Sequence, residues 1–343
     1  MVVATPTKTE QRRRRALDGL TLRDLISNWE FHNQTEGKSP HTVAWYNDTL
    51  GAFERFLERN QRSLLLADIG EPEVRDFIAD MREHRWPNGF EKEARPGGLT
   101  PESIQTRVRA LKAFFAWLHR EEFTDTHRLA RLGNYKAPRE LVAVLTDDEV
   151  ATILKVCNQK QDWGMRDYAM VTLMLDTGLR RAEVVGLRTA DVSIDGGWLK
   201  VMGKGGKERI VPFGTVTQRV LWRYFRQYRA EPLGEDVYFF LTLDGRPLSK
   251  DGFASIFVRL RRRSGVTRLR PHLLRHTFAT RYLIHGGDVF SLKQILGHTT
   301  LEMVQRYVNL ASAQVSGQHR KFSPMDRMLA GPRDDRRRGA GVR

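Results

Sequence analysis

The stretch PHLLRHTFAT, at residues 271–280, places two histidines and an arginine among apolar residues. His272 and Arg275 are three positions apart, so a helix would present both on the same face. On its own, such a pair is more often a satisfied pair of helix-surface side chains than part of a functional site. Its interpretation therefore depends on the motifs that lie before and after it in the chain.

Two of these motifs mark helix boundaries. The segment TGLRRAE, at residues 177–183, follows an apolar helical pattern and predicts a glycine-marked turn that opens a new helix. The segment LGH, at residues 296–298, predicts a helix that ends at its glycine. Thr299 and Glu302 then form a capping signal for a further helix, which carries Tyr307. Each motif also has a structural explanation: an ion pair, a capping histidine or a half-buried core tyrosine.

A glycine-rich turn joins two expected strands. Residues 198–202 and 208–212 predict the strands, and GKGGK at residues 203–207 forms the turn between them. The turn resembles a phosphate-binding loop, but such a loop needs a glycine, four residues, then Gly-Lys and a hydroxyl residue. Val201 and Glu208 occupy the first and last of these positions, which excludes a nucleotide hydrolase of that type. The acidic residues are scattered rather than clustered as a two-metal nuclease requires.

The first third of the chain predicts a compact helical domain. Ser39-Pro40 and Thr100-Pro101 each place a capping residue before a proline, which marks the start of a helix. Apolar residues then recur at helical spacing through residues 43–57 and 108–118. The glycine- and proline-rich segment 87–98 predicts a loop within this domain.

A segment without periodicity, residues 134–144, predicts a linker. We expect the domain boundary near Pro138. Thr146 and Glu149 form a capping box, which opens the first helix of the next domain.

The charge balance indicates a polyanionic partner. The 343 residues include 57 Lys plus Arg against 41 Asp plus Glu, a formal net charge of +16, and such an excess attracts nucleic acid. Cys157 is the only cysteine, which excludes an internal disulfide and a multi-cysteine zinc site. Apolar runs are too short for a membrane span, and Arg12–Arg15 precede no apolar stretch of a signal peptide. We expect a cytoplasmic, nucleoid-associated protein with no membrane partner.

Together, the motifs resemble the catalytic blocks of the tyrosine recombinase (phage integrase) family, in particular those of Xer-type recombinases and mobile-element integrases. The resembling segments are 177–187, 203–212, 271–280, 296–300 and Tyr307. The resemblance extends over about residues 20–310, and the second domain carries the specific motifs. It implies a mainly α fold with a small β-sheet, in which a helical core-binding (SAM-like) domain precedes a tyrosine-recombinase catalytic domain.

The linker and this resemblance predict four parts. They are a basic flexible arm at residues 1–19, a helical core-binding, DNA-binding domain at 20–137, a catalytic domain at 138–313 and a partly disordered C-terminal tail at 314–343. In the family, the region of this tail often docks on a neighbouring protomer.

The resemblance implies six catalytic residues and no metal ligand. The six are Arg180, Lys204, His272, Arg275, His298 and Tyr307. The neighbouring Arg181 and His276 are set aside, because the motifs fix the assignment on the other arginine and the other histidine.

Cleavage of a phosphodiester without a metal ion calls for these residue types. The two arginines would neutralise the non-bridging oxygens. Tyr307 would attack the phosphorus with His272 as its base, because tyrosine is mostly protonated at neutral pH. His298 would donate to a phosphate oxygen, and Lys204 would protonate the departing 5′ oxygen. Glu183 either holds a basic residue of the site or is a plain surface acid.

The implied function is a site-specific DNA recombinase or integrase that cuts and rejoins duplex DNA through a 3′-phosphotyrosine intermediate, without ATP, metal or another cofactor. The implied assembly is a homo-tetramer on paired recombination sites, with a directionality factor as a possible further partner. Basic residues near the site would contact phosphates, which positions the protein without reading sequence. The candidates are Lys207, Arg209, Arg259, Arg261, Arg262, Arg263, Arg268 and Arg270.

Two other functions fit the same motifs. A catalytically silent relative would bind DNA without becoming attached to it. A type IB topoisomerase would use similar tyrosine chemistry to relax supercoils without site preference. The complete set of six residues favours an active enzyme, and the LGH block with the glycine-rich hairpin favours the recombinase.

Overall fold

The computed structural model describes most of the chain. The described residues are 19–85, 95–138, 143–203, 206, 208–235, 237–298, 300–301, 304–305, 307 and 323–329. Two predicted site residues, Lys204 and Lys207, lie outside them, as do almost all of the expected N-terminal arm and most of the expected tail.

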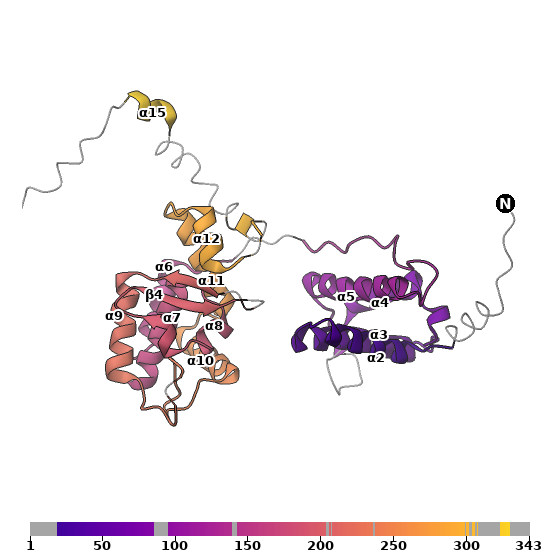
Figure 1. Cartoon of the computed structure of the whole chain (residues 1–343), viewed down its shortest axis with the longest axis horizontal. Coiled ribbons are helices and arrows are strands. Elements are labelled where there is room, and N and C mark those ends of the chain that lie inside the picture. Colours follow the sequence, from indigo (N-terminus) through magenta and orange to yellow (C-terminus); the bar gives the residue numbers. More distant parts are fainter. Residues whose placement is uncertain are drawn as a thin grey trace, which may run out of the picture. The chain divides into compact units, whose positions relative to one another are not determined.

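The chain divides into two units, Met1–Arg139 and Glu140–Arg343, which are drawn in Figure 1. The described elements of both units are mainly helical and the sheets are small, as the sequence predicted. None of the helices in the described ranges has the length and apolarity needed to cross a bilayer.

Helices dominate the first unit. They are α2 (Leu22–Thr35), α3 (Pro40–Arg59), α4 (Glu71–Glu83) and α5 (Pro101–Arg120). Both predicted helix starts are confirmed, because the side chains of Ser39 and Thr100 accept hydrogen bonds from backbone N–H groups three residues further on. The core between the helices is aromatic, with Trp29, Phe53 and Phe114 all buried.

The predicted loop of the first unit contains a short antiparallel ladder at its base. Strand β1 (His84–Arg85) pairs with β2 (Arg95–Pro96). Two-residue strands are too short to show the alternation by which a strand is recognised in a sequence, so the pattern predicted only a loop here.

The second unit combines helices with a three-stranded sheet, which buries Leu199, Val201 and Val211 on one face and exposes Met202 and Ile210 on the other. The helices are α6 (Asp147–Lys155), α7 (Asp162–Thr177), α8 (Arg181–Val185), α9 (Thr215–Arg223), α10 (Lys250–Ser264), α11 (Pro271–Ile284) and α12 (Val289–Leu296). A further short helix, α15 (Pro324–Leu329), lies in the tail region. The capping box predicted at the start of α6 is confirmed, since Thr146 and Glu149 exchange both hydrogen bonds.

The sheet consists of β3 (Val192–Ser193), β4 (Trp198–Met202) and β5 (Glu208–Pro212), in that order and antiparallel. Strands β4 and β5 are the two arms of the predicted hairpin, and their bounds are those that the sequence indicated. Leu199 lies opposite Val211, and both side chains are buried in the core of the unit.

Two glycines end helices α7 and α12. Gly178 follows α7 with φ of 63°, and Gly297 follows α12 with φ of 62°. This left-handed conformation favours glycine, because a side chain at positive φ clashes with the following carbonyl. Helix α11 packs against both α7 and α12, and Figure 1 shows α11 and α12 together in the second unit. The ends of α7 and α12 therefore converge on α11.

Candidate active site

Arg275 occupies the centre of the candidate site. Its side chain is buried, and its guanidinium donates to the backbone oxygens of Gly178 at 2.7 Å and Leu296 at 2.8 Å. It also contacts Nε2 of His298 at 2.9 Å. Two of these three partners are main-chain atoms at the ends of α7 and α12, so Arg275 ties both ends to α11.

Burial lowers the pKa of this arginine but leaves it charged. Desolvation, followed by the nearby positive charge of Arg180, lowers the pKa of Arg275 to about 10. A guanidinium with that pKa remains protonated at neutral pH. The site therefore holds a desolvated positive charge beside a second arginine. A bound anion would be stabilised there, because it would compensate both positive charges.

The contact with Arg275 indicates the hydrogen-bonding role of one nitrogen of His298. A guanidinium has only hydrogen-bond donors. Nε2 of His298 therefore acts as the acceptor in this contact.

Glu183 joins two arginines into a network. The backbone N–H of Arg180 donates to Oε2 of Glu183 at 2.8 Å, and the Arg180 side chain donates to Oε1 at 3.0 Å. The guanidinium of Arg209 grips both carboxylate oxygens, at 2.9 and 3.0 Å, and donates to the backbone oxygen of Ile295 at 2.8 Å. The Glu183 side chain is only 6% exposed. Of the two interpretations offered by the sequence, the structure favours the acid that holds basic residues.

The ionisation of Glu183 depends on this network. Burial alone would raise the pKa of its carboxyl, but the hydrogen bonds from Arg209 and from the Arg180 backbone, together with both positive charges, outweigh burial and leave the pKa below its ordinary value. Glu183 is therefore a carboxylate at neutral pH. It holds Arg180, the residue that precedes α8, through both the backbone N–H and the side chain.

Tyr307 lies in an apolar cluster beside Arg275. Its side chain is buried against Phe278, Leu296 and Val304. Its hydroxyl lies 2.8 Å from Nδ1 of His276, and the two ring centroids are 5.6 Å apart. The hydroxyl of the phenol is thus held by His276 and not by His272, the base that the motifs predict.

His272 lies one helical turn before His276, with ring centroids 6.5 Å apart. Its side chain is solvent-accessible, yet partial desolvation and then the charges of Arg275 and Arg180 lower its pKa below the ordinary value. Within the described residues it makes no hydrogen bond to Tyr307. The structure therefore associates His272 with the arginines rather than with the phenol.

Five of the six predicted catalytic residues gather around α11 and the ends of α7 and α12. They are Arg180, His272, Arg275, His298 and Tyr307. The sixth, Lys204, lies outside the described residues. The motifs favoured His272 over His276 and indicated only a DNA contact for Arg209. The partners of His276 and Arg209 lie 31 and 26 residues away, so no local motif links them. Among the described residues, no three His, Cys, Asp or Glu side chains gather into a metal-binding group.

Three of the predicted phosphate contacts are engaged within the fold. Arg209 binds Glu183, Arg259 binds the buried Asp167 at 2.6 Å, and Arg268 binds Glu149 at 2.5 Å. Arg263 stacks on Trp163, with its guanidinium carbon 4.5 Å from the ring centroid. The remaining described candidates, Arg261, Arg262 and Arg270, are exposed, and they form no ion pair with any described carboxylate. These three have the more accessible charges.

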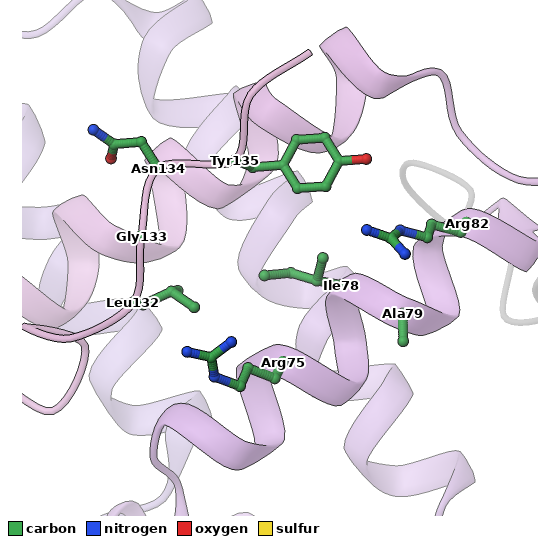
Figure 2. A pocket seen from close by; sticks show the side chains of 8 residues that line it. All are labelled: Arg75, Ile78, Ala79, Arg82, Leu132, Gly133, Asn134 and Tyr135. Carbon is green, nitrogen blue, oxygen red and sulfur yellow. The ribbon is translucent and has the colours of Figure 1, made fainter. Parts of the chain in front are cut away.

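A separate cavity of about 330 Å³ lies in the first unit. It is lined by Arg75, Ile78, Ala79 and Arg82 of α4 and by residues 132–135. Figure 2 shows the two arginines on either side of Ile78, and the guanidinium of Arg82 lies 5.8 Å from the ring centroid of Tyr135. All its lining residues belong to the first unit, so it is not part of the cluster around Arg275.

Comparison with known proteins links both units to one family. The family model described as "Phage integrase family" matches residues 143–314. A second model, described as "Phage integrase, N-terminal SAM-like domain", matches residues 28–122.

Similar proteins extend over most of the chain. The tyrosine recombinase XerD of Listeria innocua is 29% identical over 308 residues, which is 88% of this chain and 99% of that relative. The XerH site-specific recombinase bound to a palindromic difH substrate, in a post-cleavage complex, has a TM-score of 0.64 at 19% identity, covering 85% of this chain and 82% of that one. A lambda integrase tetramer bound to a Holliday junction has a TM-score of 0.63 at 19% identity, covering 87% and 83%. At these identities the two solved structures establish the fold.

Proposed function

This chain belongs to the phage integrase family of tyrosine site-specific recombinases, and we propose that it cuts and rejoins duplex DNA through a covalent bond to Tyr307. The observation that carries the proposal is the position of this phenol beside Arg275, in a cluster that also holds Arg180 and His298. A tyrosine with two guanidiniums and two histidines nearby can attack a phosphodiester without a metal ion.

The arginines would bind the scissile phosphate. As the Tyr307 oxygen attacks, negative charge grows on the two non-bridging oxygens, and planar guanidiniums neutralise it with paired hydrogen bonds. Arg275 is desolvated and held by main-chain oxygens, so it need not reorganise during the reaction. The accessible His272 would contact the same phosphate, and His298 would support Arg275 beside it.

The bond to the 5′ oxygen breaks as the bond from Tyr307 to phosphorus forms. We assign protonation of the departing oxygen to Lys204, because an ammonium group can donate a proton and this lysine lies in the sequence between β4 and β5. The products would be a 3′-phosphotyrosine and a free 5′-hydroxyl. A partner strand's 5′-hydroxyl reverses the step, so the bond energy is kept and neither ATP nor a metal is required.

The assembly is proposed by analogy with relatives. Lambda integrase has been solved as a tetramer on a Holliday junction, and XerH on its DNA substrate. We propose that four copies of this chain act on two DNA sites in the cytoplasm, at the nucleoid, with exposed Arg261, Arg262 and Arg270 contacting phosphates. The same chemistry serves integration, excision, transposition and chromosome-dimer resolution, and a directionality factor is a possible further partner of such an assembly.

A nicked suicide duplex tests the nucleophile. Wild-type protein should become covalently attached to the DNA on a denaturing gel, whereas Tyr307→Phe should shift the same DNA with unchanged affinity and form no adduct. Tyr282→Phe is the matched control, because Tyr282 packs beside Phe278 in the same cluster and its variant should still form the adduct. Attachment that survives Tyr307→Phe, or a wild-type protein that binds and never attaches, would refute the proposal.

A further inference from the structure

The hydroxyl of Tyr307 has a specific partner in the fold. Nδ1 of His276 lies 2.8 Å from it, a normal distance for a hydrogen bond between a phenol and an imidazole. The rings lie at 47° to each other with centroids 5.6 Å apart, so the contact includes packing as well as the polar bond. This histidine is not one of the six residues carried over from the motifs.

Both partners of the contact are packed within the fold. His276 follows Arg275 on α11, and Arg275 is locked to the ends of α7 and α12 by its carbonyl contacts. The Tyr307 ring is 2% exposed and packs against Leu296 and Val304, which are fully buried. A phenol in an apolar cluster needs a partner for its hydroxyl, because an unsatisfied polar group in that environment costs about 1–3 kcal/mol. The imidazole satisfies this need at the atom that would react.

We propose that His276 is a further catalytic residue, which accepts the proton of the Tyr307 hydroxyl as the phenol attacks the scissile phosphate. This inference rests on the proposed role of Tyr307. In the step, the O–H bond breaks, the proton moves to Nδ1 of His276, the freed electron pair forms the bond to phosphorus, and the bond to the 5′ oxygen breaks. The 5′ oxygen takes its proton from the general acid, and the reverse reaction returns the first proton to the phenol.

The two histidines of α11 then have different tasks. His272 is accessible, lies among the positive charges of Arg275 and Arg180, and makes no hydrogen bond to the phenol within the described part of the chain. His276 is partly buried and contacts the phenol directly. His272 therefore faces the phosphate side of the reaction and His276 the nucleophile side.

The variants His276→Ala and His276→Asn separate proton transfer from positioning. An asparagine side chain keeps a polar atom near the position of Nδ1, but an amide does not accept a proton at neutral pH. Both variants should bind the DNA site and melt within a few degrees of wild type. In single-turnover adduct formation by the full chain, His276→Ala should be ~100-fold slower at neutral pH, and His276→Asn at least ~10-fold slower, as expected for loss of a proton acceptor.

A substrate with sulfur at the bridging 5′ position isolates the nucleophile side, because a thiolate leaves without protonation. On this duplex, Lys204→Ala should recover most of its activity, whereas His276→Ala should stay slow near pH 7. Between about pH 7 and about pH 9.5 the ratio of the wild-type rate to the His276→Ala rate should fall. An ordinary phenol ionises near pH 10, and an ionised phenol needs no proton acceptor.

Several results would overturn the inference while leaving the proposed function intact. These are a His276→Ala rate equal to wild type, full recovery in His276→Asn, rescue of His276→Ala by the bridging sulfur, or a rate ratio that stays constant with pH, which would indicate a structural defect. Failure of the proposed function has a different signature, because wild type would then form no adduct or Tyr307→Phe would still form one.

Discussion

Replacing Gly178 with alanine should destabilise the catalytic unit by about 2–5 kcal/mol. The backbone at this residue has φ of 63°, where any side chain costs about 1–2 kcal/mol. A Cβ would also lie 2.5 Å from Cδ1 of Phe278 and 2.7 Å from Cδ2 of Leu296, well inside the ordinary separation of roughly 3.5–4.0 Å. Overpacking of this kind costs about 1–3 kcal/mol in a core.

Gly265 supplies the matched control. It ends α10 with φ of 70°, and a Cβ there would meet no atom within 4 Å. Gly265→Ala should therefore cost only the backbone part, about 1–2 kcal/mol. The difference between the two variants measures the overlap with Phe278 and Leu296 alone.

Urea unfolding of the full chain, followed by a probe in the second unit, measures both values. The same variants report on activity, because the Gly178 oxygen accepts from Arg275 and both displaced side chains pack with Tyr307. Gly178→Ala should slow covalent adduct formation more than Gly265→Ala does. Equal destabilisation of the two variants would refute the overlap, and full activity in Gly178→Ala would refute the coupling to Arg275.

Two further predictions concern the charges of the site. Glu183→Gln should lower the free energy of unfolding by about 3 kcal/mol near neutral pH, because it leaves mostly buried guanidiniums without their counter-charge. Asp147→Asn is the control, because it breaks an exposed pair with Arg281 and should lower the free energy of unfolding by under about 0.5 kcal/mol. The pKa of Glu183 is lower in the folded protein than in the unfolded chain. Its contribution to stability is therefore fully present above the ordinary carboxyl pKa near 4.3 and is lost as the pH falls through the folded pKa. The melting temperatures of wild type and Glu183→Gln should accordingly converge in acid and differ near pH 7. NMR titration of His272 should give a pKa below 6.5 that rises in Arg180→Gln and changes less in Arg181→Gln, because Arg181 is the weakest of the four charges that lower it; a His272 pKa indifferent to Arg180 would contradict the electrostatic account.

Local signals in the sequence were sufficient for much of the fold. Helix starts at Ser39, Thr100 and Thr146 depend on contacts three residues apart, so the capping residues alone predict them. The hairpin of β4 and β5 is equally local, because a glycine-rich turn joins its strands directly. The resemblance to phage integrases supplied the catalytic set, and the roles of those residues stay predictions.

Contacts between distant segments were beyond the reach of such patterns. Arg259 pairs with Asp167 across 92 residues, and nothing near either residue distinguishes this arginine from the exposed Arg261 and Arg262. Arg209 binds Glu183 and the Ile295 oxygen only because the sheet, α8 and α12 meet. The tertiary packing decides which arginines support the site and which face solvent.

The grip of main-chain oxygens on Arg275 has a consequence for engineering. The Gly178 and Leu296 carbonyls belong to the peptide backbone, so they persist whatever side chains are introduced elsewhere. Libraries that diversify surface positions to change target preference can therefore leave this anchorage untouched. Loop insertions that shift the ends of α7 or α12 would disturb these contacts. Variants with a new target preference should therefore be built by substitution rather than by insertion at those two helix ends.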